Sequence, residues 1–471
     1  MAKSNWMHMG TALKMNATNY PDKLGWQDKS KEFTFKQWND RSCRLTNGLH
    51  RIGVGQKDRF AVLAYNRGEW MDIYAGAAKG GQIVVPLMFR LAGPDIEFIV
   101  NHSECKGMIV EAPFVDLING SGTTGRPKGV VRSHESYIAD YYLNNINMGV
   151  RNTDKVMLVM PMCHVNSIFY SFPYTLITAP VFVYNMVSFD PEDLLKTIAE
   201  YKITFTSLVP THYIMILALP DEIKNNLDVS SIRQLLISSA PARKDLKMAI
   251  MDYFKNAELW EAYGSTEGGL VTLLRPEDQF KKLGSIGREI FGTDRIRILD
   301  EKRQPVPDGE VGELFYRTPM LFTEYWKEPE KTKEAFDNGW SSAGDMVRRD
   351  EDGYYVLVDR KANMIITGGE NVYPSEVENI VGSHPAVKDV AVIGVPDKKW
   401  GEAIKAIVIL HEGFKGTSAL AKEIIDYCQG KIAAFKKPKT IDFITDAEMP
   451  RTGTGKILHR ILREKYGKWS D

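Results

Sequence analysis

Residues 119–134 read NGSGTTGRPKGVVRSH, a polar stretch too rich in glycine to form a helix or to build a core. The glycines leave successive backbone N–H groups exposed, and Ser121, Thr123 and Thr124 add hydroxyl donors beside them. Lys128 adds an ammonium group. Exposed N–H groups, hydroxyls and a cation together form a cradle for phosphate. The stretch therefore predicts a phosphate-binding loop.

Two nucleotide motifs and a plain surface loop are the alternatives for this stretch. GSGTTG (120–125) fits the dinucleotide pattern G-x-G-x-x-G, but that pattern needs a strand before it and a helix opening on its last glycine. Here Pro127 and Gly129 follow instead. The Walker pattern fails because Arg126 stands where its lysine should be. A surface loop is the ordinary interpretation, but it does not explain the clustered donors.

The overall composition is that of an ordinary globular protein. Of 471 residues, 44% are apolar and 25% are charged, and the formal net charge is +0. The length predicts more than one folding unit. Balanced charge gives no reason to expect a nucleic-acid or anionic membrane partner. The four cysteines are far apart and form no CxxC pair, which argues against a zinc site or a disulfide framework and for a reducing cytosol.

Two segments bear on targeting and membranes. The N-terminal MAKSNWMHMGTALKMN has no apolar region of the kind that a secretory signal contains. The run FYSFPYTLITAPVFVYNMV, residues 169–187, is long enough to cross a bilayer but includes Pro173 and Pro180. We expect it to form buried strands joined by a turn, and we expect no transmembrane segment.

The order of apolar and polar runs predicts the fold class and the domains. Short β-rich runs alternate with helical patterns, as in RFAVLAYN (59–66) and QIVVPL (82–87) with a helical pattern between them, which predicts parallel sheets covered on both faces. From about residue 285, short strands between Pro, Gly and Asp turns predict antiparallel structure. A compact α+β pattern follows Arg360. We therefore expect an N-terminal domain over 1–360 and a C-terminal domain over 361–471.

SGTTGRPKG resembles, residue for residue, the phosphate loop of the adenylate-forming (AMP-forming) acyl-CoA synthetase and ligase superfamily. Further motifs of that superfamily follow in order and cover essentially the whole chain: MPMCHVNSIFY (160–170), LVPTHY (208–213), LLISSAPAR (235–243), EAYGSTEGG (261–269), GWSSAGDMVRRDEDGYYVLVDRKANMIITGGENVYPSEVE (339–378) and PRTGTGKILHR (450–460). The resemblance implies an α/β fold. Its large N-terminal domain has parallel or mixed sheets covered by helices and a small antiparallel barrel-like part, and a small, mobile α+β C-terminal domain follows.

The resemblance also implies a two-step reaction. ATP and a carboxylic acid give an acyl-adenylate and pyrophosphate, and the thiol of coenzyme A then displaces AMP. Because a carboxylate must meet a triphosphate, catalysis is mostly positioning and charge neutralisation. ATP, Mg²⁺ and coenzyme A are the expected cofactors. The implied phosphate-loop ligands are Ser121, Gly122, Thr123, Thr124, Gly125 and Lys128.

The EAYGSTEGG motif supplies further nucleotide contacts by resemblance. Tyr263 stacks on adenine, Thr266 bonds the α-phosphate and Glu267 holds Mg²⁺, with Gly264 and Ser265 between them. An aromatic face, a hydroxyl donor and a hard carboxylate ligand suit these tasks. Standing alone, such a string is more often a turn after a strand.

Two more segments of the N-terminal domain belong to the implied site. Ser239, Ala240 and Pro241 lie where the family contacts the edge of adenine. His164 and the LVPTHY segment would line the acid pocket, with His164 counted among the catalytic residues. A lone histidine after a strand is otherwise a packed or capping residue.

The later motifs contribute charged groups by resemblance. Asp345 would accept hydrogen bonds from both ribose hydroxyls, and Arg360 would reach the ribose or the phosphates. The alternative for each is a strand-end salt bridge. Lys456 is implied as the catalytic lysine that bridges the attacking carboxylate and the α-phosphate, and a solvated basic tail is the plain alternative.

The second half-reaction is implied to use another face of the C-terminal domain. After a swing about a hinge near the DR motif, the loop of Gly368, Gly369 and Glu370 would meet coenzyme A. Adjacent glycines let a narrow pantetheine arm run close to the backbone. Lys436 and Lys437 are candidate partners for the phosphates of coenzyme A, on charge and position alone.

Three features depart from the family pattern. Ala343 stands where a threonine is common, and Ala362 occupies the hinge position that is often Asp or Lys. GMIVEAPFVDLI runs into residue 119 within about ten residues, where relatives have several tens. This short passage is either a deletion or the omission of a segment from the sequence.

The sequence thus predicts an AMP-forming acid–CoA ligase. Gly268, Gly269 and the apolar SIFYSF segment favour an acid larger than acetate: a medium- or long-chain fatty, an aromatic or an alicyclic acid. The alternatives are an adenylating enzyme that loads a carrier protein, and a kinase or Walker-type NTPase. We expect a cytoplasmic protein with small-molecule partners, and leave monomer or homodimer open.

Overall fold

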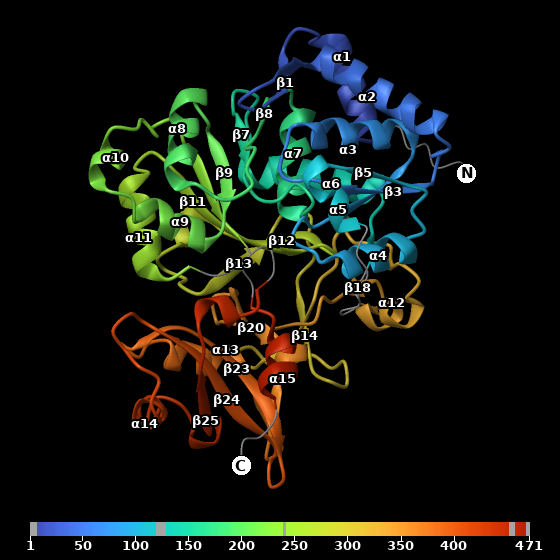
Figure 1. The fold of residues 1–471 in the computed structure, drawn as a ribbon. Coiled ribbons are helices and arrows are strands. Elements are labelled where there is room, and N and C mark those ends of the chain that lie inside the picture. Colours follow the sequence, from blue (N-terminus) through green and yellow to red (C-terminus); the bar gives the residue numbers. More distant parts are fainter. Residues whose placement is uncertain (1–6, 119–128, 239–241, 452–456, 468–471) are drawn as a thin grey trace. The chain divides into compact units, whose positions relative to one another are not determined.

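The computed structural model describes residues 7–118, 129–238, 242–451 and 457–467, which form two compact units. Unit 1 comprises Met1–Ile296 and Tyr316–Ala343, and unit 2 comprises Arg297–Phe315 and Gly344–Asp471. Figure 1 shows most of unit 1 from blue to yellow, its later part, which includes α12, in orange, and most of unit 2 in orange and red. The domain boundary expected at Arg360 stays a prediction.

The large sheet of unit 1 runs in the order β13-β12-β11-β10-β9-β7-β8-β1-β2. Strands β8, β7, β9, β10 and β11 are parallel neighbours, and β2, β12 and β13 are antiparallel additions at the two ends. The bounds are β1 Leu24–Gln27, β2 Glu32–Thr34, β7 Val156–Leu158, β8 Val181–Val183, β9 Phe205–Leu208, β10 Gln234–Ile237, β11 Glu258–Ser265, β12 Gly269–Leu274 and β13 Ser285–Glu289.

Helices cover both faces of this sheet, because its central strands are apolar on both sides. All residues of β7, β9 and β10 are buried. On β10, Leu236 packs into the core that contains α7, while Leu235 and Ile237 pack into the core that contains α8, α9 and α11. The helices of unit 1 are α1 Met9–Asn19, α2 Phe35–Arg51, α3 Glu69–Gly80, α4 Gly93–His102, α5 Val115–Ile118, α6 His134–Met148, α7 Val165–Leu176, α8 Pro191–Tyr201, α9 Pro210–Leu217, α10 Asp221–Asn225, α11 Lys244–Tyr253 and α12 Pro329–Ala335.

Two smaller sheets of unit 1 flank the glycine-rich stretch in the sequence. The parallel sheet β4-β3-β5 consists of β3 Arg59–Leu63, β4 Ile83–Leu87 and β5 Gly107–Val110. The antiparallel pair of β6 Val130–Val131 and β16 Glu324–Tyr325 begins within the last residues of the stretch.

Unit 2 contains an antiparallel sheet in the order β14-β15-β19-β20 and a second sheet in the order β22-β21-β24-β23, with β25 parallel to β24. Helices α13 Pro374–Val381, α14 Ser418–Tyr427 and α15 His459–Tyr466 belong to this unit. Its strands are β14 Arg297–Leu299, β15 Gly312–Phe315, β19 Asp345–Arg349, β20 Tyr355–Arg360, β21 Ile365–Thr367, β22 Glu370–Val372, β23 Val387–Asp397, β24 Gly401–Leu410 and β25 Thr440–Phe443.

The mixed α/β architecture confirms the predicted fold class, with one local correction. The first half of the apolar run 169–187 is helical, since α7 extends to Leu176 with Pro173 inside it, and only Val181–Val183 is a strand. Burial outweighs the missing N–H of the proline, whose carbonyl accepts a hydrogen bond from Asn145 Nδ2 at 2.9 Å. Among the described helices, none is both long and apolar enough to span a membrane.

Candidate active site

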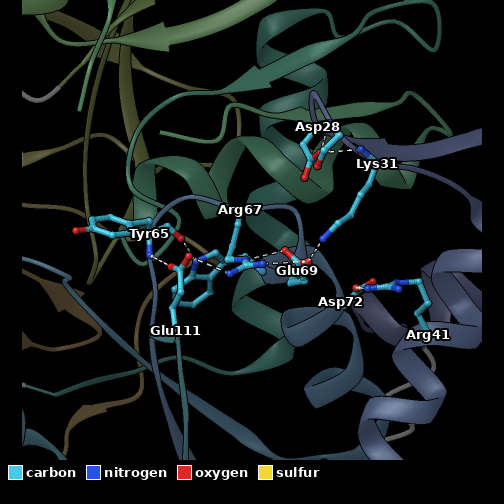
Figure 2. Close-up of polar contacts among 10 residues, drawn as sticks. Asp28, Lys31, Arg41, Tyr65, Arg67, Glu69, Asp72 and Glu111 are labelled. Carbon is cyan, nitrogen blue, oxygen red and sulfur yellow. Dashed lines mark hydrogen bonds and ion pairs between the residues drawn. The ribbon is translucent and has the colours of Figure 1, made fainter. Parts of the chain in front are cut away.

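A charged network fixes the strand that leads toward the glycine-rich stretch. Glu111, directly after β5, accepts hydrogen bonds from the backbone N–H of Tyr65 (2.8 Å) and from Arg67 (2.9 Å), as Figure 2 shows. Arg67 and Lys31 also bond Glu69. Burial alone would raise the pKa of Glu69, but these two donors hold it at about 2. The carboxyl ends of β3 and β5 are thereby joined.

Backbone pairing fixes the other end of the stretch. The N–H of Trp326 donates to Gly129 O at 2.7 Å, and the N–H of Thr323 donates to Val131 O at 2.8 Å. The indole N–H of Trp326 donates to His102 O at 3.0 Å. The predicted phosphate ligands themselves lie outside the described residues: Ser121, Gly122, Thr123, Thr124, Gly125 and Lys128.

The predicted nucleotide turn connects β11 to β12. Ser265 Oγ accepts from the N–H of Gly268 (2.9 Å) and shares a 2.8 Å hydrogen bond with the hydroxyl of Tyr316. A Cβ on Gly268 would lie 2.4 Å from the Tyr316 ring, and Gly269 has φ +70°. Packing and backbone conformation therefore account for both glycines, and they do not by themselves open an acid pocket. Tyr263 is buried and Gly264 is exposed.

Arg132 ties this turn to the residues that follow the glycine-rich stretch. Its guanidinium donates to Thr266 O (3.4 Å) and to Met320 O (2.9 Å). It also lies over the rings of Tyr137 and Phe169, at 4.6 and 4.9 Å from their centroids. One cation thus connects β6, α6, α7 and the turn, and it places Thr266 close to the strand that leaves the predicted phosphate loop.

Glu267 is held at both its backbone and its side chain. Its carbonyl accepts from the N–H of Phe322 at 2.7 Å, and its Oε1 accepts from the hydroxyl of Tyr325 at 2.8 Å. Among the described residues, no three His, Cys, Asp or Glu side chains gather into a metal cluster. A lone carboxylate fits Mg²⁺, which usually takes one or two protein carboxylates together with substrate phosphates and water.

Asp140 of α6 also holds the turn between β11 and β12. Its Oδ1 accepts from the N–H of Leu270 at 3.3 Å, and its Oδ2 accepts from Asn144 Nδ2 at 3.2 Å. Burial raises the pKa of Asp140 to about 6, although the positive charge of Arg132 acts in the opposite direction. The base of the turn therefore contains a carboxyl group whose pKa lies well above its ordinary value.

His164 caps the helix that carries the SIFYSF segment. Its Nδ1 accepts from the N–H of Asn166 at 3.2 Å at the start of α7, which is the capping role expected of a lone histidine after a strand. Asn166 Nδ2 donates to Ser238 Oγ at 2.7 Å. The predicted adenine-edge residues Ser239, Ala240 and Pro241 lie outside the described residues, directly after this contact.

A buried ion pair lies under the start of the nucleotide strand. Lys247 Nζ of α11 is 2.9 Å from Glu261 Oε2 of β11, and the two side chains are 0% and 9% exposed. Burial raises the pKa of Glu261, partly offset by Lys247. The pair joins α11 to β11 two residues before Tyr263.

In unit 2 the two predicted ribose ligands contact each other. Asp345 and Arg360 are opposite residues of β19 and β20, with Arg360 Nε 2.8 Å from Asp345 Oδ1. Asp345 is buried, while Arg360 is half exposed. This contact is the strand-end salt bridge that the sequence left as the alternative. In this arrangement the Asp345 carboxylate already has Arg360 as a cationic partner.

The Gly368–Gly369 loop is a hairpin between β21 and β22. Both glycines have positive φ, +62° and +85°, and the N–H of Gly368 donates to Trp400 O at 2.8 Å. Glu370 is exposed. The hairpin therefore presents bare backbone to solvent.

The basic candidates in unit 2 differ in what the structure describes. Lys436 Nζ is 2.5 Å from Glu376, and Lys437 Nζ bonds Gln429 at 2.7 Å, so both already have partners. The predicted catalytic Lys456 lies outside the described residues. The described residues on either side of this gap, Arg451 and Ile457, form a β-bridge.

Sequence reasoning missed the residues that hold the turn. For Arg132, the available signal was its position in VVRSH, just after the predicted phosphate-binding residues. For Tyr325 and Asp140 no such signal existed, because their partners lie 58 and 130 residues away. Contacts of that range depend on the folded sheet.

Comparison with known proteins identifies the family. Residues 13–120 and 115–326 match the AMP-binding enzyme family, and residues 376–456 match the AMP-binding enzyme C-terminal domain. The chain belongs to the AMP-binding enzyme family. The match to the AMP-binding enzyme family consists of two parts that overlap at residues 115–120.

The similar proteins cover more than nine tenths of the chain. The long-chain-fatty-acid–CoA ligase FadD13 of Mycobacterium tuberculosis is 33% identical over 98% of both chains. Feruloyl-CoA synthase of Amycolatopsis sp. is 32% identical over 92% of this chain and 94% of its own. The solved o-succinylbenzoate coenzyme A synthetase of Bacillus subtilis, in complex with ATP and magnesium ion, has a TM-score of 0.84 and 25% identity over 96% of this chain and 99% of its own.

These findings confirm several predictions from the sequence. The chain is an enzyme, an AMP-forming acid–CoA ligase, with ATP, Mg²⁺ and coenzyme A as its cofactors. The superfamily recognised from the ordered motifs is confirmed. The roles assigned to individual site residues stay predictions.

Proposed function

We propose that this ligase activates an apolar carboxylic acid of the medium- or long-chain fatty, aromatic or alicyclic kind. Similar proteins are named for a long-chain fatty acid, a feruloyl group and 2-succinylbenzoate. The apolar, buried residues of α7, which include Phe169 and Phe172, support an acid with a substantial hydrocarbon part.

In the first step a carboxylate oxygen attacks the α-phosphorus of ATP, and pyrophosphate leaves with the electrons of the broken P–O bond. We assign Lys456 to neutralise charge between the carboxylate and the α-phosphate, and Thr266 to donate to the phosphate. Glu267 would hold Mg²⁺, which neutralises phosphate charge when bound. Tyr263 would stack on adenine.

In the second step the sulfur of coenzyme A attacks the acyl carbonyl carbon. AMP leaves, and the thiol proton passes to solvent. Asp345 would orient the ribose, and the backbone of Gly368 and Gly369 would accommodate the pantetheine arm. His164 is assigned to the acid side of the site.

One observation carries this proposal. Within unit 1, Arg132 bonds Thr266 O, so the end of the predicted phosphate loop and the predicted metal-binding turn belong to one contiguous structure. In a protein that used either segment only as a surface loop, no such half-buried cation would be needed to join them.

The test is a panel of acids assayed with ATP, Mg²⁺ and coenzyme A for both AMP and pyrophosphate. We expect AMP formation that depends on the acid and is fastest with apolar acids. Fastest turnover of acetate or of a short aliphatic dicarboxylic acid would contradict the acid class. Release of ADP or phosphate would favour the kinase or Walker-type alternative, and transfer to a carrier protein but not to coenzyme A would favour the carrier-loading enzyme.

Lys456→Ala separates the two steps. We expect loss of adenylate formation with thioester formation from supplied acyl-adenylate largely retained. Equal loss of both steps would contradict the assigned role. We also propose a cytoplasmic location, which the four widely spaced cysteines support.

A further inference from the structure

The hydroxyl of Tyr325 makes a contact that the proposed reaction leaves unused. Tyr325 is 4% exposed and its hydroxyl donates to Glu267 Oε1 at 2.8 Å. The N–H of Phe322 donates to the backbone oxygen of the same glutamate at 2.7 Å. One short segment, 322–325, therefore holds Glu267 at two points.

The ring of Tyr325 is fixed by its surroundings. Its centroid lies 4.8 Å from that of Phe322, which stacks on Phe336 at 5.1 Å, and Ala335 completes the cluster. The N–H of Tyr325 donates to Thr332 Oγ1 at 3.0 Å. Because the ring cannot move freely, the hydroxyl arrives at the carboxylate at little additional cost in conformational entropy.

The same segment also pairs with the strand that leaves the glycine-rich stretch. Glu324 and Tyr325 of β16 lie opposite Val131 and Val130 of β6. A hydrogen bond on each side extends this pairing, from Thr323 to Val131 and from Trp326 to Gly129. Two backbone hydrogen bonds and one side-chain bond thus link the end of the proposed phosphate loop to the proposed metal ligand.

We propose that Tyr325 is a positioning residue for the Mg²⁺–ATP site, acting through Glu267. The inference rests on the proposed role of Glu267 as metal ligand. The phenol holds the carboxylate in one orientation and occupies one of its oxygens, so the metal–nucleotide complex meets a pre-oriented ligand. Hydrogen-bond partners of metal ligands tune affinity in this way, and their removal typically weakens metal binding about 10- to 100-fold.

Tyr325→Phe tests the proposal, because it removes only the hydroxyl and keeps the packed ring. With ATP present and acid absent, the affinity for Mn²⁺ measured by electron paramagnetic resonance should fall about 10-fold. At saturating Mg²⁺, kcat for adenylate formation should stay within about threefold of the wild type, so the effect appears in the Mg²⁺ requirement. Tyr142→Phe, at an exposed tyrosine of α6, is the matched control and should change neither quantity.

A double-mutant cycle with Glu267→Gln separates positioning from a general structural effect. If Tyr325 acts through the carboxylate, Tyr325→Phe should have little further effect on kcat/KM in the Glu267→Gln background. Fully additive losses would overturn the proposal, as would unchanged Mn²⁺ affinity in Tyr325→Phe. Thermal unfolding of each variant shows whether the fold is retained.

Different results contradict the proposed function and the role of Tyr325. A wild-type protein that forms no AMP with any acid contradicts the proposed function. A wild-type protein that forms AMP, with a Tyr325→Phe variant of unaltered Mn²⁺ affinity, contradicts only the role of Tyr325.

Discussion

The turn at Thr266–Glu267 in unit 1 and the hairpin at Gly368–Gly369 in unit 2 are both expected to meet ligands, but they are built in opposite ways. Buried or half-buried side chains hold the first: Arg132 on Thr266 O, Tyr325 on Glu267 and Asp140 on Leu270. The second depends on backbone conformations at positive φ and one backbone hydrogen bond to Trp400, itself 45% exposed.

The difference matches what each turn is proposed to do. A triphosphate and its metal need ligands in fixed positions, so the groups that hold them must be rigid before binding. A narrow pantetheine arm needs bare backbone, which glycine supplies. We therefore expect the first turn to respond to substitutions at distant buried partners and the second to respond only to changes in its own backbone.

The largest effect is expected from the ion pair under the nucleotide strand. Lys247→Met leaves Glu261 buried without its cation, which should lower the free energy of unfolding by about 3–5 kcal/mol. Denaturant unfolding measures the change. The double variant Lys247→Met/Glu261→Leu removes both charges and should recover most of the loss. A single variant as stable as the wild type would show that β11 does not depend on this support.

The second prediction concerns the carboxyl group at the base of the turn. Because burial raises the pKa of Asp140 from 3.8 to about 6, its ionisation opposes folding, and its contribution to stability is complete at low pH and lost as pH rises from about 4 to 6. The loss amounts to about 3 kcal/mol. Asp140→Asn should abolish this part of the pH dependence of unfolding, whereas Asp116→Asn, at an exposed site, should not. Parallel pH profiles for wild type and Asp140→Asn would contradict the prediction.

The third prediction concerns the cation that joins the turn to β6. Arg132→Met removes charge-assisted hydrogen bonds to Thr266 O and Met320 O, which are worth about 1.5–3 kcal/mol each when lost. We expect kcat/KM for adenylate formation to fall about 30-fold, as measured by pyrophosphate exchange. Arg51→Met, at the exposed end of α2, is the control. An equal fall in thioester formation from supplied acyl-adenylate would mean that Arg132 supports the fold rather than the turn.

The sequence alone predicted the strands of both units well, since their apolar runs and turn residues are local signals. RFAVLAYN and QIVVPL both contain strands of the structure at the expected places. The run 169–176 was misjudged because Pro173 argues locally against a helix, and only burial against the sheet and α6 shows why the helix persists.

The candidate site divides along the same line. Motif strings indicated Tyr263, Glu267 and His164 as candidates, because their residue types suit the chemistry, and their roles stay predictions. Arg132, Tyr325 and Asp140 act through partners that only tertiary structure brings together, so no window of sequence contains both members of a pair. The two turns therefore differ in how far sequence predicts them. The glycines of the hairpin can be read from the sequence, whereas the side chains that hold the turn at Thr266–Glu267 cannot.

The smallest effect is expected in the hairpin, where the comparison between the turns is sharpest. Gly368→Ala must place a side chain at φ +62° with its Cβ 2.9 Å from Trp400 Cε3, whereas Gly369→Ala at φ +85° meets no atom within 4 Å. Each substitution should lower the free energy of unfolding by about 1 kcal/mol through backbone strain. The loss should be somewhat larger for Gly368→Ala, and adding Trp400→Ala should remove this excess because it removes the close contact. If the hairpin meets coenzyme A, thioester formation from supplied acyl-adenylate should slow about fivefold while pyrophosphate exchange is unchanged. Equal slowing of pyrophosphate exchange would contradict the independence of the two turns. The turn at Thr266–Glu267 would then depend on the Gly368–Gly369 hairpin, although the contacts described for each turn involve different residues.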